Sequence, residues 1–492
     1  MSSDAGPGGG RGAADDRERR ARRRPDRSPP QSDVAPGHDQ SAAERPLPPY
    51  PDSLGPRVFH AAQWMRDPVD LLDRGGTDHD VFRAHLLGVG DWYQLCHPDH
   101  SKRVLLAERE KFRKSEDFGI AFGDGLLTVE GETWTRQRQT LQPLFVRESV
   151  RGAAGTMVEQ VKRRVDRWTD GQRLALQSEL TDLTLDVLFA AILGRELALD
   201  GDEKVRRAAE ALHDWFVPTS YPLPQWIPTP ARRRFREGKR TLQQEADRLL
   251  EEAARNPPDD PAEADDLMRL LAALRETDAV DAGMPSDEHL RDQMVTVIFA
   301  GHDTTTTSLT FALWALAEHP EVRERFHAEV DALDGPPTAE DIEAGRLEFT
   351  DRVVTETLRL FPPVYGLPRV ADRDVTVDGY RVPEGERINV VLYRIQRDPR
   401  FFDRPDEFDP DRWTDEFRQS LHDFAYAPFG GGPRICIGRQ FALLEATLAL
   451  ATIGRDYELY YLGEEGDDGG PPLSPQMTLR MEAGQEFLVT ER

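Results

Sequence analysis

The chain of 492 residues contains little cysteine, little lysine and no long apolar run. Its two cysteines, Cys96 and Cys436, are too few for a disulfide framework, so we expect any functional thiol to be reduced and intracellular. No segment has the length and hydrophobicity of a signal peptide or a membrane span, and the mean hydropathy of −0.61 agrees. These absences argue against a secreted disulfide scaffold and an integral membrane protein, and they predict a soluble, cytoplasmic protein.

Basic residues are also fewer than acidic ones. Lys and Arg number 63 against 89 Asp and Glu, which gives a formal net charge of −26 and a pI near 4.9. A field of this sign repels nucleic-acid phosphates and argues against a nucleic-acid-binding function. Six of the basic residues are lysines and the other 57 are arginines. A GC-rich genome or a high-salt cytoplasm can produce this bias. We adopt the second as a hypothesis, because dense carboxylates keep a surface hydrated in salt.

Residues 1–45 differ in composition from the rest of the chain. They are rich in Gly, Pro, Ser, Asp and Arg and have almost no apolar residues, so they cannot bury enough surface to fold. Their nine arginines and eight acids nearly cancel, which leaves almost all of the net charge on the remainder. No linker divides that remainder. The sequence therefore predicts a disordered tail, 1–45, and one large domain, 46–492.

The apolar pattern predicts a mainly α-helical fold with small β-sheets, in the α+β class. A hairpin is expected over residues 81–96, with Cys96 as a small buried side chain. Helices are expected over 176–193, 205–216 and 232–254, and a long central helix over 286–319. The proline-studded segment 218–228 predicts a packed loop or, alternatively, a substrate gate or a lip that touches a membrane.

Cys436 lies on a glycine-rich loop, Phe429-Gly-Gly-Gly-Pro-Arg-Ile-Cys436-Ile-Gly438, directly before a helix-forming stretch. Backbone N–H groups and the positive end of a helix dipole stabilise a thiolate at such a position, and glycines let a broad, flat ligand approach the backbone. A nucleophile, a metal ligand and a buried apolar side chain are the alternatives. The local sequence supplies no general base and too few Cys or His for zinc, so axial ligation of haem iron fits best.

This loop resembles the haem-binding signature of the cytochrome P450 superfamily, of the soluble prokaryotic type. The resemblance implies haem b with Cys436 as its axial thiolate, and a single large P450-type fold whose long central helix lies over the haem. The match covers every defining position of the ten-residue signature: Phe429, Gly432, Arg434, Cys436 and Gly438.

A second motif of the family precedes the loop. Glu356 and Arg359 stand at i and i+3 of a predicted helix, where the two side chains can pair. The segment Phe408-Asp-Pro-Asp-Arg412-Trp resembles the family segment whose arginine joins that pair, with Asp411 in place of the commoner glutamate. The resemblance implies a buried structural triad of Glu356, Arg359 and Arg412 that fixes the Cys436 loop.

The predicted central helix carries Ala300-Gly-His-Asp-Thr-Thr305, which matches the family's oxygen-activation motif. An acid followed by an alcohol can relay protons, and burying the pair Asp303–Thr304 in an apolar helix costs free energy that structure alone does not require. Gly301 is expected to leave room for dioxygen and substrate. The resemblance therefore implies Asp303, Thr304 and Gly301 as catalytic residues.

Four further side chains are implied as partners of the two haem propionates. Trp134 and Arg138 form a WxxxR pattern that resembles the family's propionate-binding helix. Arg434 lies within the signature, and Arg369 lies where the family often places another partner. An indole N–H and three guanidinium groups suit two carboxylates in a dry cleft.

The resemblance implies a haem-thiolate monooxygenase that hydroxylates a lipophilic organic substrate with O2 and two electrons. The electrons are expected to come from NAD(P)H through a separate, ferredoxin-type protein, because the chain carries no flavin or nicotinamide fingerprint. The alternatives are a peroxide-driven peroxygenase or an isomerase of the same fold, and a non-catalytic haem sensor. The pair Asp303–Thr304 argues against these alternatives.

Overall fold

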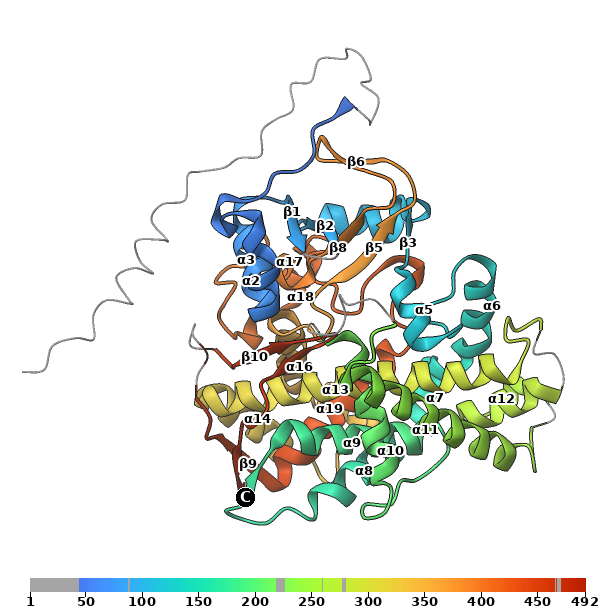
Figure 1. Ribbon diagram of the computed structural model, residues 1–492. Coiled ribbons are helices and arrows are strands. Elements are labelled where there is room, and N and C mark those ends of the chain that lie inside the picture. The colour runs from blue at the N-terminus through green and yellow to red at the C-terminus, as the bar shows by residue number, and fades with distance from the viewer. Residues whose placement is uncertain are drawn as a thin grey trace, which may run out of the picture.

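The computed structural model describes residues 44–86, 89–217, 226–258, 260–276, 280–464, 466 and 470–492. Residues 1–43 of the predicted tail and residues 218–225 of the proline-studded segment lie outside the described residues. In Figure 1, most helices gather in the lower part of the molecule, and a β-sheet with α2 and α3 lies above them. The predicted class, mainly α with small sheets, is confirmed.

The helices follow one another along most of the described chain. They are α2 (His60–Arg66), α3 (Pro68–Asp78), α4 (Pro98–Lys102), α5 (Glu116–Phe122), α6 (Gly131–Leu141), α7 (Arg147–Gly152), α8 (Ala154–Val165), α9 (Leu176–Ala191), α10 (Glu203–Glu210), α11 (Pro230–Ala253), α12 (Leu267–Glu276), α13 (Asp287–Glu318), α14 (Pro320–Asp331), α15 (Ala339–Glu343), α16 (Glu348–Leu360), α17 (Leu392–Ile395), α18 (Asp415–Ser420) and α19 (Arg439–Asp456).

The central helix is α13, whose 32 residues cross the helical part of the molecule (Figure 1). Ser286 is extended just before it, and Asp287 and Glu288 lie in its first turn, where the helix dipole favours acids. Pro320 follows closely after its end. The helix packs against α9, α16 and α19 and is buried along most of its length. The prediction of a long helix over 286–319 is confirmed.

Five hydroxyl side chains of α13 find an acceptor within the helix itself. Each donates to the carbonyl four residues earlier at 2.8–3.1 Å, and the Thr306 hydroxyl also bonds to the Thr184 hydroxyl of α9 at 2.7 Å. These residues are Thr304, Thr305, Thr306, Ser308 and Thr310.

Four small sheets complete the part of the fold that the structure describes. The largest has the strand order β1-β2-β8-β5-β3, in which only β2 and β8 run parallel, and its β1–β2 pair confirms the predicted hairpin. The others are β4-β12-β9, β10-β11 and β6-β7. The strands are β1 (Val81–Leu86), β2 (Gly90–Leu95), β3 (Phe112–Arg113), β4 (Arg173–Leu174), β5 (Leu367–Ala371), β6 (Val375–Val377), β7 (Tyr380–Val382), β8 (Arg387–Val390), β9 (Tyr457–Tyr461), β10 (Leu473–Pro475), β11 (Leu479–Met481) and β12 (Phe487–Glu491).

The predicted helix over 205–216 is continuous only as far as Glu210. The chain then tightens into a 3-10 turn, η7 (Ala211–Phe216), which packs Trp215 against Phe235 of α11.

Cys96 is buried, as predicted, and burial raises the pKa of its thiol. Within the described ranges, no helix combines the length and hydrophobicity that a membrane span needs.

Candidate active site

The Cys436 loop runs from Phe429 to the first turn of α19. The Cys436 N–H donates to the Phe429 carbonyl at 3.1 Å, which closes the loop on itself. Gly432 has a φ angle of 67°, a conformation that favours glycine, and a Cβ there would lie 2.2 Å from the Leu105 carbonyl oxygen. Glycine at this position therefore lets the loop lie directly against the backbone of the 103–107 turn.

The Cys436 side chain is exposed. Burial by surrounding protein is nevertheless the largest influence on the pKa of its thiol and raises it, as expected for a side chain that lines an internal space. The Gly438 N–H and the guanidinium groups of Arg138 and Arg439 act in the opposite direction and favour the thiolate. The loop thus offers an accessible sulfur with donors and positive charge around it.

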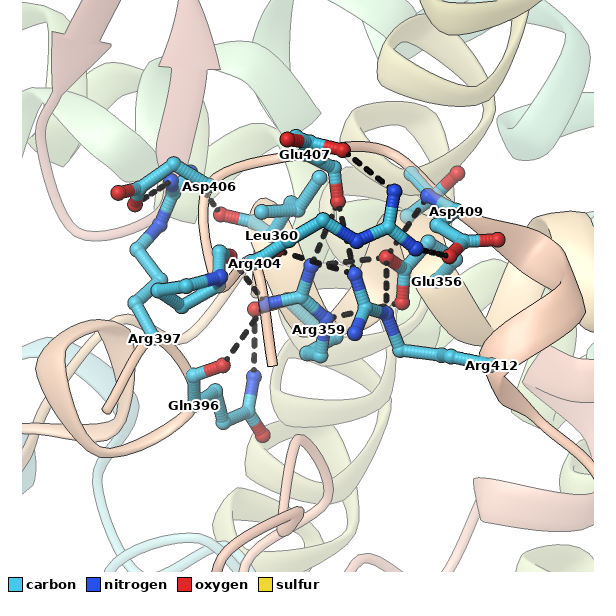
Figure 2. Close-up of polar contacts among 12 residues, drawn as sticks. Glu356, Arg359, Leu360, Gln396, Arg397, Arg404, Asp406, Glu407, Asp409 and Arg412 are labelled. Carbon is cyan, nitrogen blue, oxygen red and sulfur yellow. Dashed lines mark hydrogen bonds and ion pairs between the residues drawn. The ribbon is translucent and has the colours of Figure 1, made fainter. Parts of the chain in front are cut away.

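Glu356, Arg359 and Arg412 meet in one network (Figure 2). Arg359 donates to both carboxylate oxygens of Glu356 at 2.8 Å, and the Arg412 Nε donates to Glu356 Oε1 at 2.9 Å. Trp413, to which the sequence assigned no role, donates its indole N–H to Glu356 Oε2 at 2.9 Å. Glu356 and Arg359 are fully buried, and partners on every side offset the cost of burying their charges. The structure brings the predicted triad together.

The triad reaches the Cys436 loop through Gln396, which the sequence analysis missed. The Gln396 carbonyl accepts from Arg359 at 3.0 Å. The Gln396 Nε2 donates to the carbonyls of Leu358 and Arg359 at 2.9 and 3.1 Å, and its Oε1 accepts a hydrogen bond from the Ala427 N–H at 3.0 Å. Ala427 lies two residues before Phe429, so one buried glutamine connects α16 to the start of the loop. A lone glutamine after the apolar run of α17 is a weak sequence signal.

One stripe of α13 is accessible although both of its flanks are buried. Ala300 is exposed, and Val297, Gly301 and Thr304 are partly exposed. Ala300, Gly301 and Thr304 follow Val297 by three, four and seven residues, a spacing that places all four on one face of the helix. The Thr304 hydroxyl donates to the Ala300 carbonyl at 2.9 Å and so lies along the same stripe. The helix therefore presents an alcohol to an open space.

Gly301 lies on this stripe but also faces α9. A Cβ at Gly301 would lie 2.8 Å from the Leu188 Cδ1, closer than carbon atoms normally approach. The missing side chain thus lets α9 and α13 pack closely. Its predicted role in leaving room for dioxygen and substrate stays a prediction.

Asp303 lies on another face of α13 and is fully buried. Its carboxylate accepts hydrogen bonds from Thr478 and from Arg480 of β11, and neither residue was singled out from the sequence. The proton relay through Asp303 stays a prediction. It requires that the hydrogen bonds to Thr478 and Arg480 open first.

Three cations converge beside the loop with too little negative charge to balance them. Burial lowers the pKa of the Lys114 amine, Arg434 and Arg369 lower it further, and Glu130 is the carboxylate that opposes them. Burial, followed by Arg434, lowers the pKa of Arg369 to about 10. A cluster of this composition suits a ligand with two carboxylates. Lys114 was missed by the sequence analysis, although lysine is rare in this chain.

Trp134 and Arg138, both in α6, join the site at different places. The guanidinium of Arg434 lies over the Trp134 ring, 4.8 Å from its centre, so Trp134 belongs with the cations. Arg138 Nη1 instead donates to the Ile435 carbonyl at 2.9 Å and braces the residue before Cys436. A contact of Arg138 with a propionate stays a prediction.

These features fit haem. The accessible thiol provides an iron ligand. The open stripe with its alcohol provides an open face, and the cationic cluster provides partners for two carboxylates. Residues 77–480 match the sequence profile of the family described as "Cytochrome P450". The chain belongs to the cytochrome P450 family. As a P450 it is an oxidoreductase, a monooxygenase with a haem-thiolate cofactor.

Known P450 proteins resemble the chain over most of its length. It is 33% identical over 410 residues to pentalenene oxygenase of Streptomyces avermitilis, covering 81% of this chain and 88% of the relative. It is 30% identical over 444 residues to cyclooctatin synthase of Streptomyces melanosporofaciens, covering 89% of this chain and 94% of the relative. A crystal structure of the cytochrome P450DA heme domain matches with a TM-score of 0.75 at 27% identity, covering 91% of this chain and 98% of that chain.

Proposed function

We propose that this P450 hydroxylates a cyclic terpene hydrocarbon, with dioxygen as the oxidant and electrons from a separate ferredoxin-type protein. The observation that carries the proposal is the accessible Cys436 thiol, on a loop that is tied to the buried triad through Gln396. Cys436 is the proposed iron ligand. The proposed propionate partners are Lys114, Trp134, Arg369 and Arg434.

An aromatic cluster supports an apolar substrate. Phe118 and Phe122 of α5, Phe216 of η7 and Phe299 of α13 lie with neighbouring ring centres 4.4–6.5 Å apart. Phe299 directly precedes Ala300 of the open stripe. Aromatic rings contact hydrocarbons without requiring polar groups. Two of the similar proteins, pentalenene oxygenase and cyclooctatin synthase, have names that refer to terpenes.

Haem, when bound, supplies the chemistry of dioxygen and electrons, and its thiolate ligand favours O–O cleavage. The residues of the chain control charge and protons around it. The Gly438 N–H and the Arg138 guanidinium favour negative charge on the Cys436 sulfur. Thr304 holds a proton on its hydroxyl at the open stripe and can redirect it from the Ala300 carbonyl toward a bound ligand.

Two experiments test the proposal. Reduced protein under carbon monoxide should show the strongly red-shifted Soret band of thiolate ligation. Cys436→Ala should abolish that band, and Cys96→Ala, which changes a buried cysteine, is the matched control that should retain it.

The second experiment measures turnover. Incubation of the protein with pentalenene, NADPH, a heterologous ferredoxin and its reductase should give a hydroxylated product that contains one oxygen atom from ¹⁸O₂. Product formation with hydrogen peroxide but not with this electron supply would favour the peroxygenase alternative. No product across a panel of cyclic terpenes would contradict the substrate class.

A further inference from the structure

Two histidines and a carboxylate meet between η7 and α13. His213 comes from η7, whereas His302 and Asp303 are neighbours on α13, and all three side chains are buried. The His213 Nε2 lies 3.7 Å from Asp303 Oδ1, and the two imidazole rings meet edge to face with their centres 5.8 Å apart. Each residue offers one nitrogen or oxygen atom that lies within 4.8 Å of those of the other two. Two imidazoles and a carboxylate thus surround one point in the interior.

His302 presents a free lone pair to this point. Its Nδ1 lies 2.6 Å from the Ile298 carbonyl oxygen, which can only accept, so Nδ1 carries the proton and Nε2 does not. The Nε2 has no hydrogen-bond partner among the described residues. Histidines that bind metals have this arrangement, in which the nitrogen away from the metal donates to a carbonyl or a carboxylate. His302 is therefore oriented as a ligand through Nε2.

His213 is buried without a hydrogen bond. Neither of its ring nitrogens has a partner within the described ranges, and burying such groups unpaired costs free energy. The ring packs against that of Phe299, with the two centres 4.9 Å apart, which holds the imidazole in place. Burial lowers the pKa of His213 to about 3 and also lowers that of His302, so both rings are neutral. An imidazolium paired with Asp303 therefore does not account for the cluster.

The carboxylate of the cluster is held by hydrogen bonds, as ligating carboxylates are. Asp303 Oδ2 accepts from the Thr478 hydroxyl, and Oδ1 accepts from Arg480. A metal ion here would share Oδ1 with the guanidinium. Arg480 lowers and Asp303 raises the pKa of Glu210 in α10, so a second carboxylate lies close enough to offset part of the added positive charge.

We propose that His213, His302 and Asp303 form a second metal site, apart from the haem, that binds Zn²⁺. Imidazole and carboxylate ligands suit zinc, and three protein ligands leave a fourth position for water. Bonds of about 2.0–2.2 Å place tetrahedral ligand atoms about 3.3 Å apart, so the side chains must close around the ion by at most about 1.5 Å. The ion would join η7 to α13 beside the aromatic cluster. The inference goes beyond the proposed function.

Zinc binding to the ferric holoenzyme tests the inference. The holoenzyme is dialysed to equilibrium against Zn²⁺ with excess Mg²⁺, and its zinc and iron contents are then measured. Magnesium prefers oxygen ligands, so it occupies carboxylates of the acidic surface but does not compete for imidazoles. One saturable equivalent of zinc per haem iron should persist in magnesium. A buried water would satisfy the same ring nitrogens, and the absence of a saturable zinc site would favour water and overturn the inference.

Two variants and a matched control assign the site. His213→Gln and His302→Gln each remove a ligand and should weaken zinc binding roughly 100-fold or more, because loss of a second-shell partner alone costs about 10–100-fold. The control is His100→Gln, which removes another buried histidine, bonded to the single carboxylate of Asp378 at 2.8 Å. It should bind zinc like the wild type. The Soret band with carbon monoxide shows whether each variant keeps its haem site. Zinc binding that is unchanged in both cluster variants would overturn the inference.

X-ray absorption at the zinc edge identifies the ligands without any mutation. The wild-type holoenzyme with one equivalent of zinc should show two imidazole nitrogens at about 2.0–2.1 Å and oxygen neighbours at about 2.0–2.2 Å. The haem iron absorbs at a different energy and does not contribute. A shell of oxygen alone would place the ion on the acidic surface and would also overturn the inference.

These readouts need no substrate. Failure of the wild type to oxygenate any terpene would therefore contradict the proposed function alone, and the zinc measurements would still decide whether the three residues form a metal site.

Discussion

Thr304 is the single residue whose loss should be seen most directly in the chemistry. Thr304→Ala removes the hydroxyl on the open stripe, so protons should reach the bound oxygen less often and more electrons should end in hydrogen peroxide. Product per NADPH should fall roughly tenfold or more. Thr310→Ala is the control, because Thr310 is fully buried on the same helix and bonds only within it in the described structure. Wild-type coupling in Thr304→Ala would contradict the proposed role.

Glu445 of α19 should make stability depend on pH. Its side chain is buried, and burial raises its pKa to about 8 although the Thr305 hydroxyl acts in the opposite direction. An unfolded glutamate titrates near pH 4.3. Between about pH 4.3 and pH 8 the folded protein therefore holds this proton more tightly than the unfolded chain does. Stability should fall as pH rises through that window, by at most about 1.4 kcal/mol per pH unit.

Glu445→Gln cannot ionise and isolates this effect. The free energy of unfolding of the variant, relative to the wild type, should increase steadily from pH 5 to pH 8 in chemical denaturation of the holoenzyme. A difference that stays constant across this range would show that Glu445 does not titrate there.

At the scale of elements, two charge pairs attach the 403–413 segment to helices and should differ sharply in strength. The fully buried Glu356 of α16 pairs with Arg412, whereas Asp411 pairs with Arg325 of α14 at the surface. Glu356→Gln leaves buried guanidinium groups without a counter-charge and should cost about 3–5 kcal/mol and release haem. Asp411→Asn should cost at most about 1 kcal/mol, because water screens the pair. Equal losses in denaturation and haem retention would contradict the assignment of the triad as the anchor of the loop.

The elements also show what the sequence could and could not predict. The boundaries of α13 follow from local signals, Ser286 before it and Pro320 after it, and the Cys436 loop follows from its glycines. Gln396 and Arg480 were missed because their roles depend on segments far apart in the sequence. Arg480 is one of 57 arginines, and nothing near it in the sequence distinguishes it from a solvated surface charge. Long-range pairing of this kind is decided by the fold.

At the scale of the whole molecule, the net charge of −26 should make stability depend on salt. Repulsion among surface carboxylates weakens as the screening length falls from about 30 Å at 0.01 M to about 3 Å at 1 M salt. The melting temperature of the holoenzyme should therefore rise as KCl increases over this range, and activity should be lost on dialysis into low salt. A matched sucrose series controls for exclusion of cosolute from the surface. Unchanged folding and activity in low salt would contradict the high-salt hypothesis.

The cationic cluster has a practical consequence for chemical labelling. Lys114 is one of six lysines, and burial beside Arg434 and Arg369 lowers the pKa of its amine far below the usual value. Only the unprotonated form of an amine attacks acylating reagents, and a lowered pKa increases the fraction of that form. Lys114 should therefore acylate readily in the empty protein and resist in the loaded one, with the other five lysines as internal standards. A peptide map of the acylated protein would then report which fraction of a preparation has acquired its cofactor.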